Sequence, residues 1–217
     1  MQTRTAFYRT ISLIFLLCAG VFSWLAWQVQ TRGEIVHVDQ QIAATLHESA
    51  GPWGIFALKV FTFFGEFVAL TALAIIAAAI LFRARAHGLA AGWLFAMIGT
   101  GVLNEALKRA FARPRPSFAE PVAMASGFSF PSGHSMGTMV AITMLAYAAF
   151  RWMSSAKWRR VTIVFAATWT LTMGFSRMYL GVHYLSDVVA GFAAGGAWAC
   201  LCMAGLEKVK ARSLPAG

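Results

Sequence analysis

The residues from Ser176 to Asp187 combine groups that can carry out acid–base or nucleophilic chemistry. His183 and Asp187 are four residues apart, so in a helix they share one face and the carboxylate can hydrogen-bond one imidazole nitrogen. The other nitrogen then stays free as a base or nucleophile. Arg177, ahead of the turn at Gly181, offers a planar fork for a phosphate or a carboxylate. The competing interpretation is a local hydrogen-bond network at a membrane interface.

A basic cluster lies earlier in the chain and holds Lys108, Arg109, Arg113 and Arg115. Two Arg-Pro steps keep this stretch extended, and so many cations in a short run suit a polyanion. A basic edge that snorkels to lipid headgroups is the alternative. Glu105, one turn before Lys108, is expected to pair with Lys108 or Arg109 beside the cluster, or to form a plain ion pair at a helix end.

A third cluster reads Pro131-Ser132-Gly133-His134 and opens an apolar run. Pro131 fits a first helical turn, and the next residues would present free backbone N–H groups at the positive end of a helix. Gly133 allows close approach of a ligand. An ordinary capped helix start with a polar histidine is the competing interpretation.

The elements that position these clusters are apolar helices. The chain has 217 residues, is 59% hydrophobic and only 12% charged, and has a mean hydropathy of +0.66. These values predict a polytopic membrane protein. The net charge of +10 fits cytoplasmic loops and headgroup contacts better than nucleic acid, and no nucleic-acid partner is expected.

The fold class is predicted to be all-α, with one domain over residues 1–217 and the motifs within about 100–190. Six spans are expected at about 11–30, 60–82, 88–108, 132–152, 160–178 and 184–206. The first is interpreted as a retained helix, with a cleaved signal peptide as the alternative. Gly191 and Gly195 predict close helix packing, within the bundle or in a dimer.

The positive charges predict the orientation of the bundle. Most Lys and Arg residues fall in the segments that are cytoplasmic if both termini are cytoplasmic. The outer segment from Gln30 to Pro52 is expected to cap the outer face without carrying a chemical signal of its own. Glu66, at the outer end of the second span, is expected to line a pocket, or to cap or pack its helix.

In such an alternating bundle, the three polar clusters meet on one side. They occupy the end of span 3, the start of span 4, the end of span 5 and the start of span 6. An anionic ligand on the outer face would explain why cations gather there against the general charge bias.

The motifs resemble those of the type 2 phosphatidic acid phosphatase superfamily of membrane lipid phosphatases. They stand here as Lys108 to Arg115-Pro116, Pro131-Ser132-Gly133-His134, and Ser176-Arg177 to His183 and Asp187. Order and spacing match, over about half of the chain.

The resemblance implies that His183 attacks phosphorus, Asp187 orients it, and His134 serves as general acid and then base. It implies that the phosphoryl oxygens are held by Lys108, Arg115, Ser132, Gly133 and Arg177. Arg113, outside the strict motif, is a secondary candidate for binding a second phosphate or a headgroup. Glu105, as a partner of the cations, and Glu66, as a residue lining the pocket, are the other secondary candidates. No metal and no other cofactor is implied.

A bacterial inner-membrane phosphatase with its site facing the periplasm is therefore expected. Undecaprenyl diphosphate and phosphatidylglycerophosphate are the substrates that the resemblance suggests. Two alternatives remain open at this point: a phosphotransferase that uses the same histidine, and a lipid-binding or transport protein without catalysis. The sequence leaves the oligomeric state undetermined.

Overall fold

The computed structural model describes residues 2–212, with side chains from residue 4 to residue 210. The described chain is all-α, as predicted. Its helices are α1 (Gln2–Gln30), α2 (Glu34–Glu48), α3 (Pro52–Thr62), α4 (Phe67–Arg83), α5 (His87–Phe111), α6 (Gly133–Ala149), α7 (Ala156–Tyr179) and α8 (Leu185–Arg212), with a short 3-10 turn at Phe63–Gly65.

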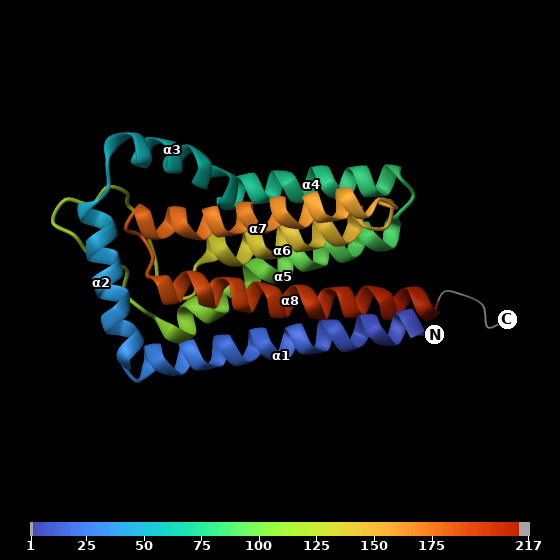
Figure 1. Ribbon diagram of the computed structural model, residues 1–217, viewed down its shortest axis with the longest axis horizontal. Helices are drawn as coiled ribbons and strands as arrows, with labels where there is room; N and C mark the ends of the chain where they lie inside the picture. Colours follow the sequence, from blue (N-terminus) through green and yellow to red (C-terminus); the bar gives the residue numbers. More distant parts are fainter. Residues whose placement is uncertain (1, 213–217) are drawn as a thin grey trace.

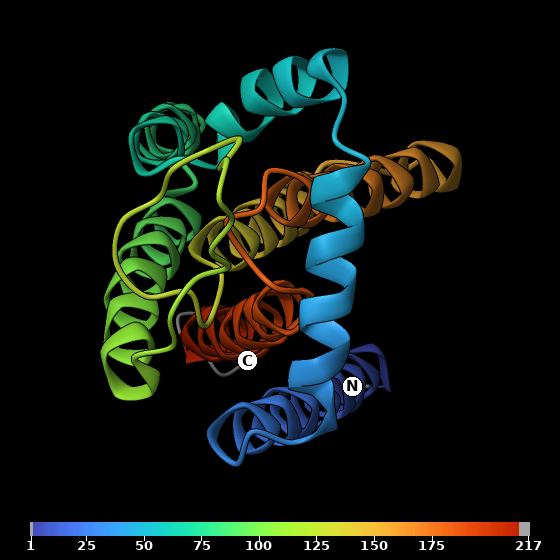
Figure 2. The same cartoon turned by 90° about the vertical axis from the view of Figure 1, so that its left-hand side faces the viewer.

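The long helices α1, α4, α5, α6, α7 and α8 run side by side along the long axis of the molecule, and α2 lies across one end of them (Figure 1). The start of α1 and the end of α8 lie at the opposite end (Figure 1). Viewed from the α2 end, the segment between α5 and α6 loops over the ends of the helices (Figure 2). One end of the bundle is therefore covered by α2 and by the segment between α5 and α6, whereas the opposite end carries the start of α1 and the end of α8 (Figure 1 and Figure 2).

Three helical stretches are long and apolar enough to cross a membrane: Arg4–Gln30, His87–Phe111 and Leu185–Lys210. The pair Pro52–Gly65 and Phe67–Arg83, bent by 47°, makes a fourth if it counts as one span. Helix α6 has only 17 residues, and α7 includes the charged Arg159, Arg160 and Arg177. Membrane-spanning helices are thus confirmed, while the count of six spans stays a prediction.

The second span is not the continuous helix predicted for 60–82. The helix ends at Thr62, and a 3-10 turn leads to Glu66, whose extended backbone begins α4. Gly65 in this turn packs so closely on His134 and Met173 that a Cβ atom would lie 2.8 Å from His134 Cδ2. The break places the backbone of the turn against the polar end of the bundle.

Helix α8 forms the centre of the bundle and packs along α1 and α6. Its apolar window is 61% buried, against 17% for α1 and 22% for α5. A Cβ atom on Gly191 would lie 2.6 Å from Ser132 O, and one on Gly195 would lie 2.8 Å from Met136 O. The glycine pair therefore serves packing within the bundle. Large apolar side chains on α1, α4 and α5 point outward, where a membrane protein meets lipid.

Candidate active site

The three polar clusters lie together at the end of the bundle that α2 crosses. The ends of α5 and α7 and the starts of α6 and α8 meet there, with the 112–132 segment over them (Figure 2). The prediction that the clusters share one side of the bundle is consistent with this arrangement.

His183 and Asp187 are in contact, but not on one helix face as the spacing suggested. Helix α8 begins at Leu185, so His183 lies in the turn before it and Asp187 in the first helical turn. His183 Nδ1 is 3.4 Å from Asp187 Oδ2, which also accepts the backbone N–H of Tyr184 at 2.9 Å. The carboxylate thus caps the start of α8 and holds the histidine of the preceding turn.

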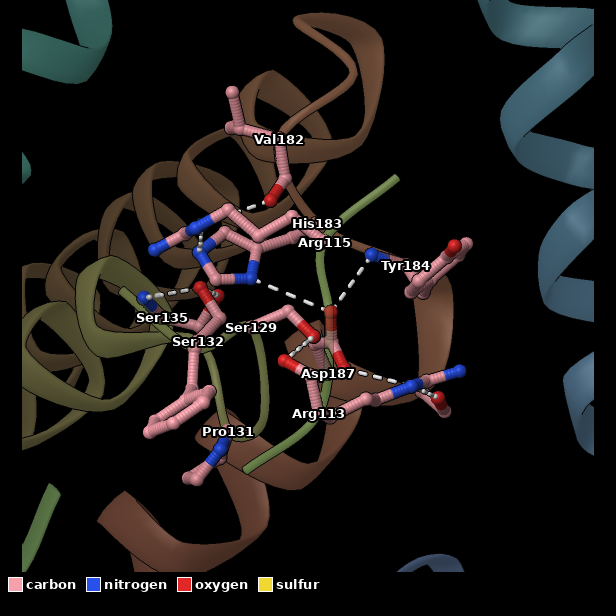
Figure 3. Close-up of polar contacts among 12 residues, drawn as sticks. Arg113, Arg115, Ser129, Pro131, Ser132, Ser135, Val182, His183, Tyr184 and Asp187 are labelled. Carbon is pink, nitrogen blue, oxygen red and sulfur yellow. Dashed lines mark hydrogen bonds and ion pairs between the residues drawn. The ribbon is translucent and has the colours of Figure 1, made fainter. Parts of the chain in front are cut away.

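Arg115 fixes the tautomer of His183. Its Nη1 lies 3.0 Å from His183 Nε2 and 2.8 Å from the carbonyl oxygen of Val182 (Figure 3). A guanidinium only donates, so Nε2 presents its lone pair and the proton resides on Nδ1, where it can be donated to Asp187. Burial lowers the pKa of His183 to about 4, although Asp187 acts to raise it. His183 is therefore neutral at pH 7, with a lone pair on the nitrogen that faces the cations.

The Ser132 to His134 segment opens α6, with Ser132 as the N-cap residue. Pro131 precedes the cap and so lies outside the first helical turn where it was predicted. Ser132 N donates to Asp187 O at 2.9 Å, and Ser132 Oγ accepts from Ser135 Oγ at 3.0 Å. Ser132 N is therefore engaged, whereas the N–H groups of Gly133 and His134 occupy the first helical turn, which lacks intrahelical acceptors.

Three buried nitrogen atoms have no hydrogen-bond partner within residues 4–210, and two of them belong to predicted site residues. These two are His134 Nε2 and Arg177 Nε, and the third is His47 Nδ1 on α2. Arg177 is 8% exposed, and its Nη1 donates to Thr62 Oγ1 at 2.7 Å, which anchors the guanidinium on α3. Buried polar groups are normally satisfied, so unpaired donors beside a cation cluster are what an anion would complete.

Lys108 and Arg115 hold the 112–132 segment in place. Lys108 Nζ donates to Phe128 O at 2.8 Å, and Arg115 donates to Gly127 O at 3.1 Å and to Ser126 O at 2.9 Å. These bonds bring both cations to the same end of the bundle as His183.

The secondary candidates have other partners. Arg113 does not present its guanidinium to a second phosphate, because Nη1 donates to Asp187 Oδ1 at 2.7 Å and Nη2 to Asp39 Oδ2 at 2.8 Å. Glu105 pairs with Arg109 at 2.7 Å on the exposed face of α5, which is one of the two pairings expected. Glu66 is exposed and is the N-cap residue of α4, although its side chain makes no capping bond.

Asp39 is the residue that sequence reasoning missed. The segment from Gln30 to Pro52 was expected to carry no chemical signal, yet it forms α2, and Asp39 is fully buried against Arg113 and Ser186. Ile35, Asp39 and Ala43 follow at helical spacing. An acid in the middle of this buried stripe was the available signal.

Within residues 4–210, no group of three or more His, Cys, Asp or Glu side chains is arranged to hold a metal ion.

Residues 89–210, more than half of the chain, match the PAP2 superfamily. The chain belongs to this superfamily. The matched residues include all three polar clusters, from Lys108 to Asp187.

Several known proteins are similar to the chain. Phosphatidylglycerophosphatase B of Bacillus subtilis (strain 168) is 39% identical over 95 residues, which cover 43% of this chain and 46% of that protein. A lipid A 1-phosphatase of Rhizobium johnstonii is 36% identical over 139 residues, or 56% of this chain and 51% of that protein. The chain thus spans about half the length of these relatives.

A solved structure extends the likeness to the whole fold. The crystal structure of a transmembrane PAP2 type phosphatidylglycerolphosphate phosphatase from Bacillus subtilis matches with a TM-score of 0.80 and 29% sequence identity. The match covers 93% of this chain and 96% of that chain.

Proposed function

We propose that this protein is an integral membrane lipid phosphatase that hydrolyses a phosphate monoester or diphosphate of a lipid through a phosphohistidine intermediate. The observation that carries the proposal is the state of His183. Its Nε2 lone pair faces Arg115, and its Nδ1 faces the Asp187 carboxylate. A neutral, oriented imidazole among cations is equipped to attack phosphorus, whereas binding alone needs only the cations.

In the first half of the reaction, His183 Nε2 attacks phosphorus and the bond from phosphorus to the leaving oxygen breaks. Arg115 exchanges its bond to Nε2 for a phosphoryl oxygen, which Lys108 and Arg177 also bind. His134 donates a proton to the leaving oxygen. The positive charge that develops on the His183 ring is stabilised by Asp187.

In the second half, a water molecule attacks the phosphohistidine. His134, now unprotonated, takes a proton from this water, and the bond between phosphorus and His183 Nε2 breaks to release inorganic phosphate. The N–H groups of Gly133 and His134 at the start of α6 face the transferring group and support its negative charge. Ser132 contributes by positioning this turn through its bonds to Asp187 and Ser135.

Phosphatidylglycerophosphate and undecaprenyl diphosphate are the substrates that we favour. The names of the Bacillus proteins that resemble the chain support the first. We place the protein in a bacterial inner membrane as six spans, with both termini cytoplasmic and the site facing the periplasm, because the positive charges favour this orientation.

The test is phosphate release by detergent-purified protein in the presence of EDTA. The substrates are phosphatidylglycerophosphate, undecaprenyl diphosphate, lipid A, phosphatidic acid and a soluble phosphate monoester. The wild-type protein should release phosphate from at least one lipid, and His183→Ala should lower the rate by about 10³-fold or more, because no nucleophile remains.

Release that EDTA abolishes, or that His183→Ala leaves intact, would overturn the mechanism. No release from any lipid, with release only after a second lipid is supplied as acceptor, would identify a phosphotransferase. Binding of these lipids without release or transfer would identify a binding or transport protein.

A further inference from the structure

A carboxylate far from the catalytic motifs is buried beside them. Asp39 lies in the middle of α2 and is 0% exposed. Its Oδ2 accepts from Arg113 Nη2 at 2.8 Å and from Ser186 Oγ, and its Oδ1 accepts the backbone N–H of Ser186 at 2.9 Å. A buried carboxylate is destabilising unless it is paired and hydrogen-bonded. The partners of Asp39 are Arg113, which also bonds to Asp187, and Ser186, which precedes Asp187 in the chain.

Arg113 links Asp39 to Asp187. The guanidinium is 7% exposed and donates Nη2 to Asp39 and Nη1 to Asp187 Oδ1, the latter at 2.7 Å. It also lies over the Tyr184 ring, with Cζ 4.3 Å from the centroid. Two carboxylates thus share one buried cation, and the chain of contacts runs Asp39, Arg113, Asp187, His183 (Figure 3 shows the last three).

Two side chains, those of Arg113 and His183, compete for the Asp187 carboxylate. Its Oδ1 is 2.7 Å from Arg113, whereas its Oδ2 is 3.4 Å from His183 Nδ1. An arginine paired with Asp187 alone would draw the carboxylate towards itself and cancel its charge. With Asp39 on the other side of the guanidinium, two carboxylates face one cation, so Asp39, Arg113 and Asp187 together keep a net negative charge. Asp187 then retains the charge that a phosphohistidine at His183 requires.

We infer that Asp39 is a positioning residue for the reaction, acting through Arg113 to hold Asp187 in place and to keep its negative charge available to His183. This inference rests on the phosphatase function proposed above. It assigns to α2 a direct part in the site, in addition to covering it.

The contacts separate this role from substrate binding. Asp39 bonds to Arg113 and Ser186, while the cations assigned to the phosphate are Lys108, Arg115 and Arg177. Loss of Asp39 should therefore lower kcat and leave KM within about twofold. A misplaced catalytic group typically costs up to about 10²-fold, so we expect kcat of Asp39→Asn to fall roughly 10- to 100-fold.

The test is a double-mutant cycle with Asp39→Asn, Arg113→Gln and both together, assayed on the best substrate of the panel above. Because Asp39 acts through Arg113, Asp39→Asn should have little further effect on kcat when Arg113→Gln is already present. Rapid-quench measurement of phosphoenzyme should show slower formation in Asp39→Asn.

Glu34→Gln is the matched control, because Glu34 is an exposed acid on the same helix. It should match the wild type. Each variant is checked by gel filtration and thermal unfolding in detergent. If Asp39→Asn does not fold, Asp39→Ser, which is smaller and also uncharged, takes its place.

A wild-type kcat in the folded Asp39 variant would overturn the inference, as would a rise in KM with unchanged kcat. Independent, additive losses in the double variant would also overturn it, since they would indicate a purely structural role. Failure of the proposed function is distinguishable, because in that case the wild-type protein itself forms no phosphohistidine.

Discussion

The bond between Arg115 and His183 determines which imidazole nitrogen carries the proton, and burial keeps that imidazole neutral. In the proposed mechanism the Nε2 lone pair attacks phosphorus once Arg115 has exchanged its bond to Nε2 for a phosphoryl oxygen. Under the same proposal, the low-dielectric surroundings that disfavour the imidazolium before reaction would also strengthen its attraction to Asp187 once phosphorus is attached.

The dependence of activity on pH follows from this burial. His183 has a pKa of about 4, so it stays unprotonated as the pH falls below 6.5, and attack is lost only as the pH falls through about 4. The acid limb of kcat/KM should lie near 4. Residual activity of Asp187→Asn should show a still lower limb, because the carboxylate that raises this pKa is gone. A limb near 6.5 that does not move in this variant would contradict the assignment.

Arg177 should not tolerate lysine. Its Nη1 is anchored on Thr62 Oγ1, and the unpaired Nε remains for the phosphate. A lysine has no planar fork that could serve both sides. Arg177→Lys should lower kcat/KM about 10- to 100-fold, the loss of one charge-assisted hydrogen bond. Arg160→Lys, at an exposed position of the same helix, is the control and should match the wild type; equal activity of both variants would remove Arg177 from the site.

At the scale of the elements, the packing of α8 on the start of α6 holds the two halves of the site together. Ser132 N donates to Asp187 O, and Gly191 lets the helices approach closely enough for this bond. The proposed catalytic geometry therefore depends on the close approach of the two helices at Gly191, a residue that takes no part in the reaction itself.

Gly191→Ala tests this contact. The added Cβ atom would lie 2.6 Å from Ser132 O and 2.9 Å from Ser135 Cβ, so the helices must separate. We expect a loss of about 1–3 kcal/mol in stability and a lower kcat. Gly205→Ala, on the same helix with nothing within 4 Å of the new atom, should be neutral or slightly stabilising. Thermal unfolding in detergent measures both, and equal melting temperatures would contradict the packing argument.

At the scale of the whole molecule, the bundle has two dissimilar ends. One carries α2 and the 112–132 segment over the polar clusters, and the other carries the start of α1, the short turns and the end of α8 (Figure 1). A lipid phosphatase needs this asymmetry, because the phosphate must be dehydrated among cations while its acyl or prenyl chain stays among apolar side chains.

The proposed orientation predicts which end a membrane-impermeant thiol reagent reaches. In a variant whose three cysteines are replaced by alanine, Glu120→Cys lies on the 112–132 segment and should be labelled in intact cells. Ser154→Cys, between α6 and α7, should be labelled only after lysis. Both positions are exposed. The reverse pattern would place the site on the cytoplasmic side.

The sequence by itself determined the all-α membrane class and the gathering of the three clusters, because hydropathy and motif spacing are local properties that survive without tertiary contacts. It also led to His183, His134, Asp187 and the cations around them. The sequence missed the break at Gly65, since this break is decided by what packs against the turn.

Only the tertiary structure decided the roles of Arg113 and Asp39. In the sequence, Arg113 is one of several cations in a basic run, and Asp39 lies 74 residues before it. Folding buries both and leaves each as the other's partner. A buried charge is stabilised only when an opposite charge lies beside it. The tertiary fold decides which two residues meet in this way, and their spacing in the sequence does not show it.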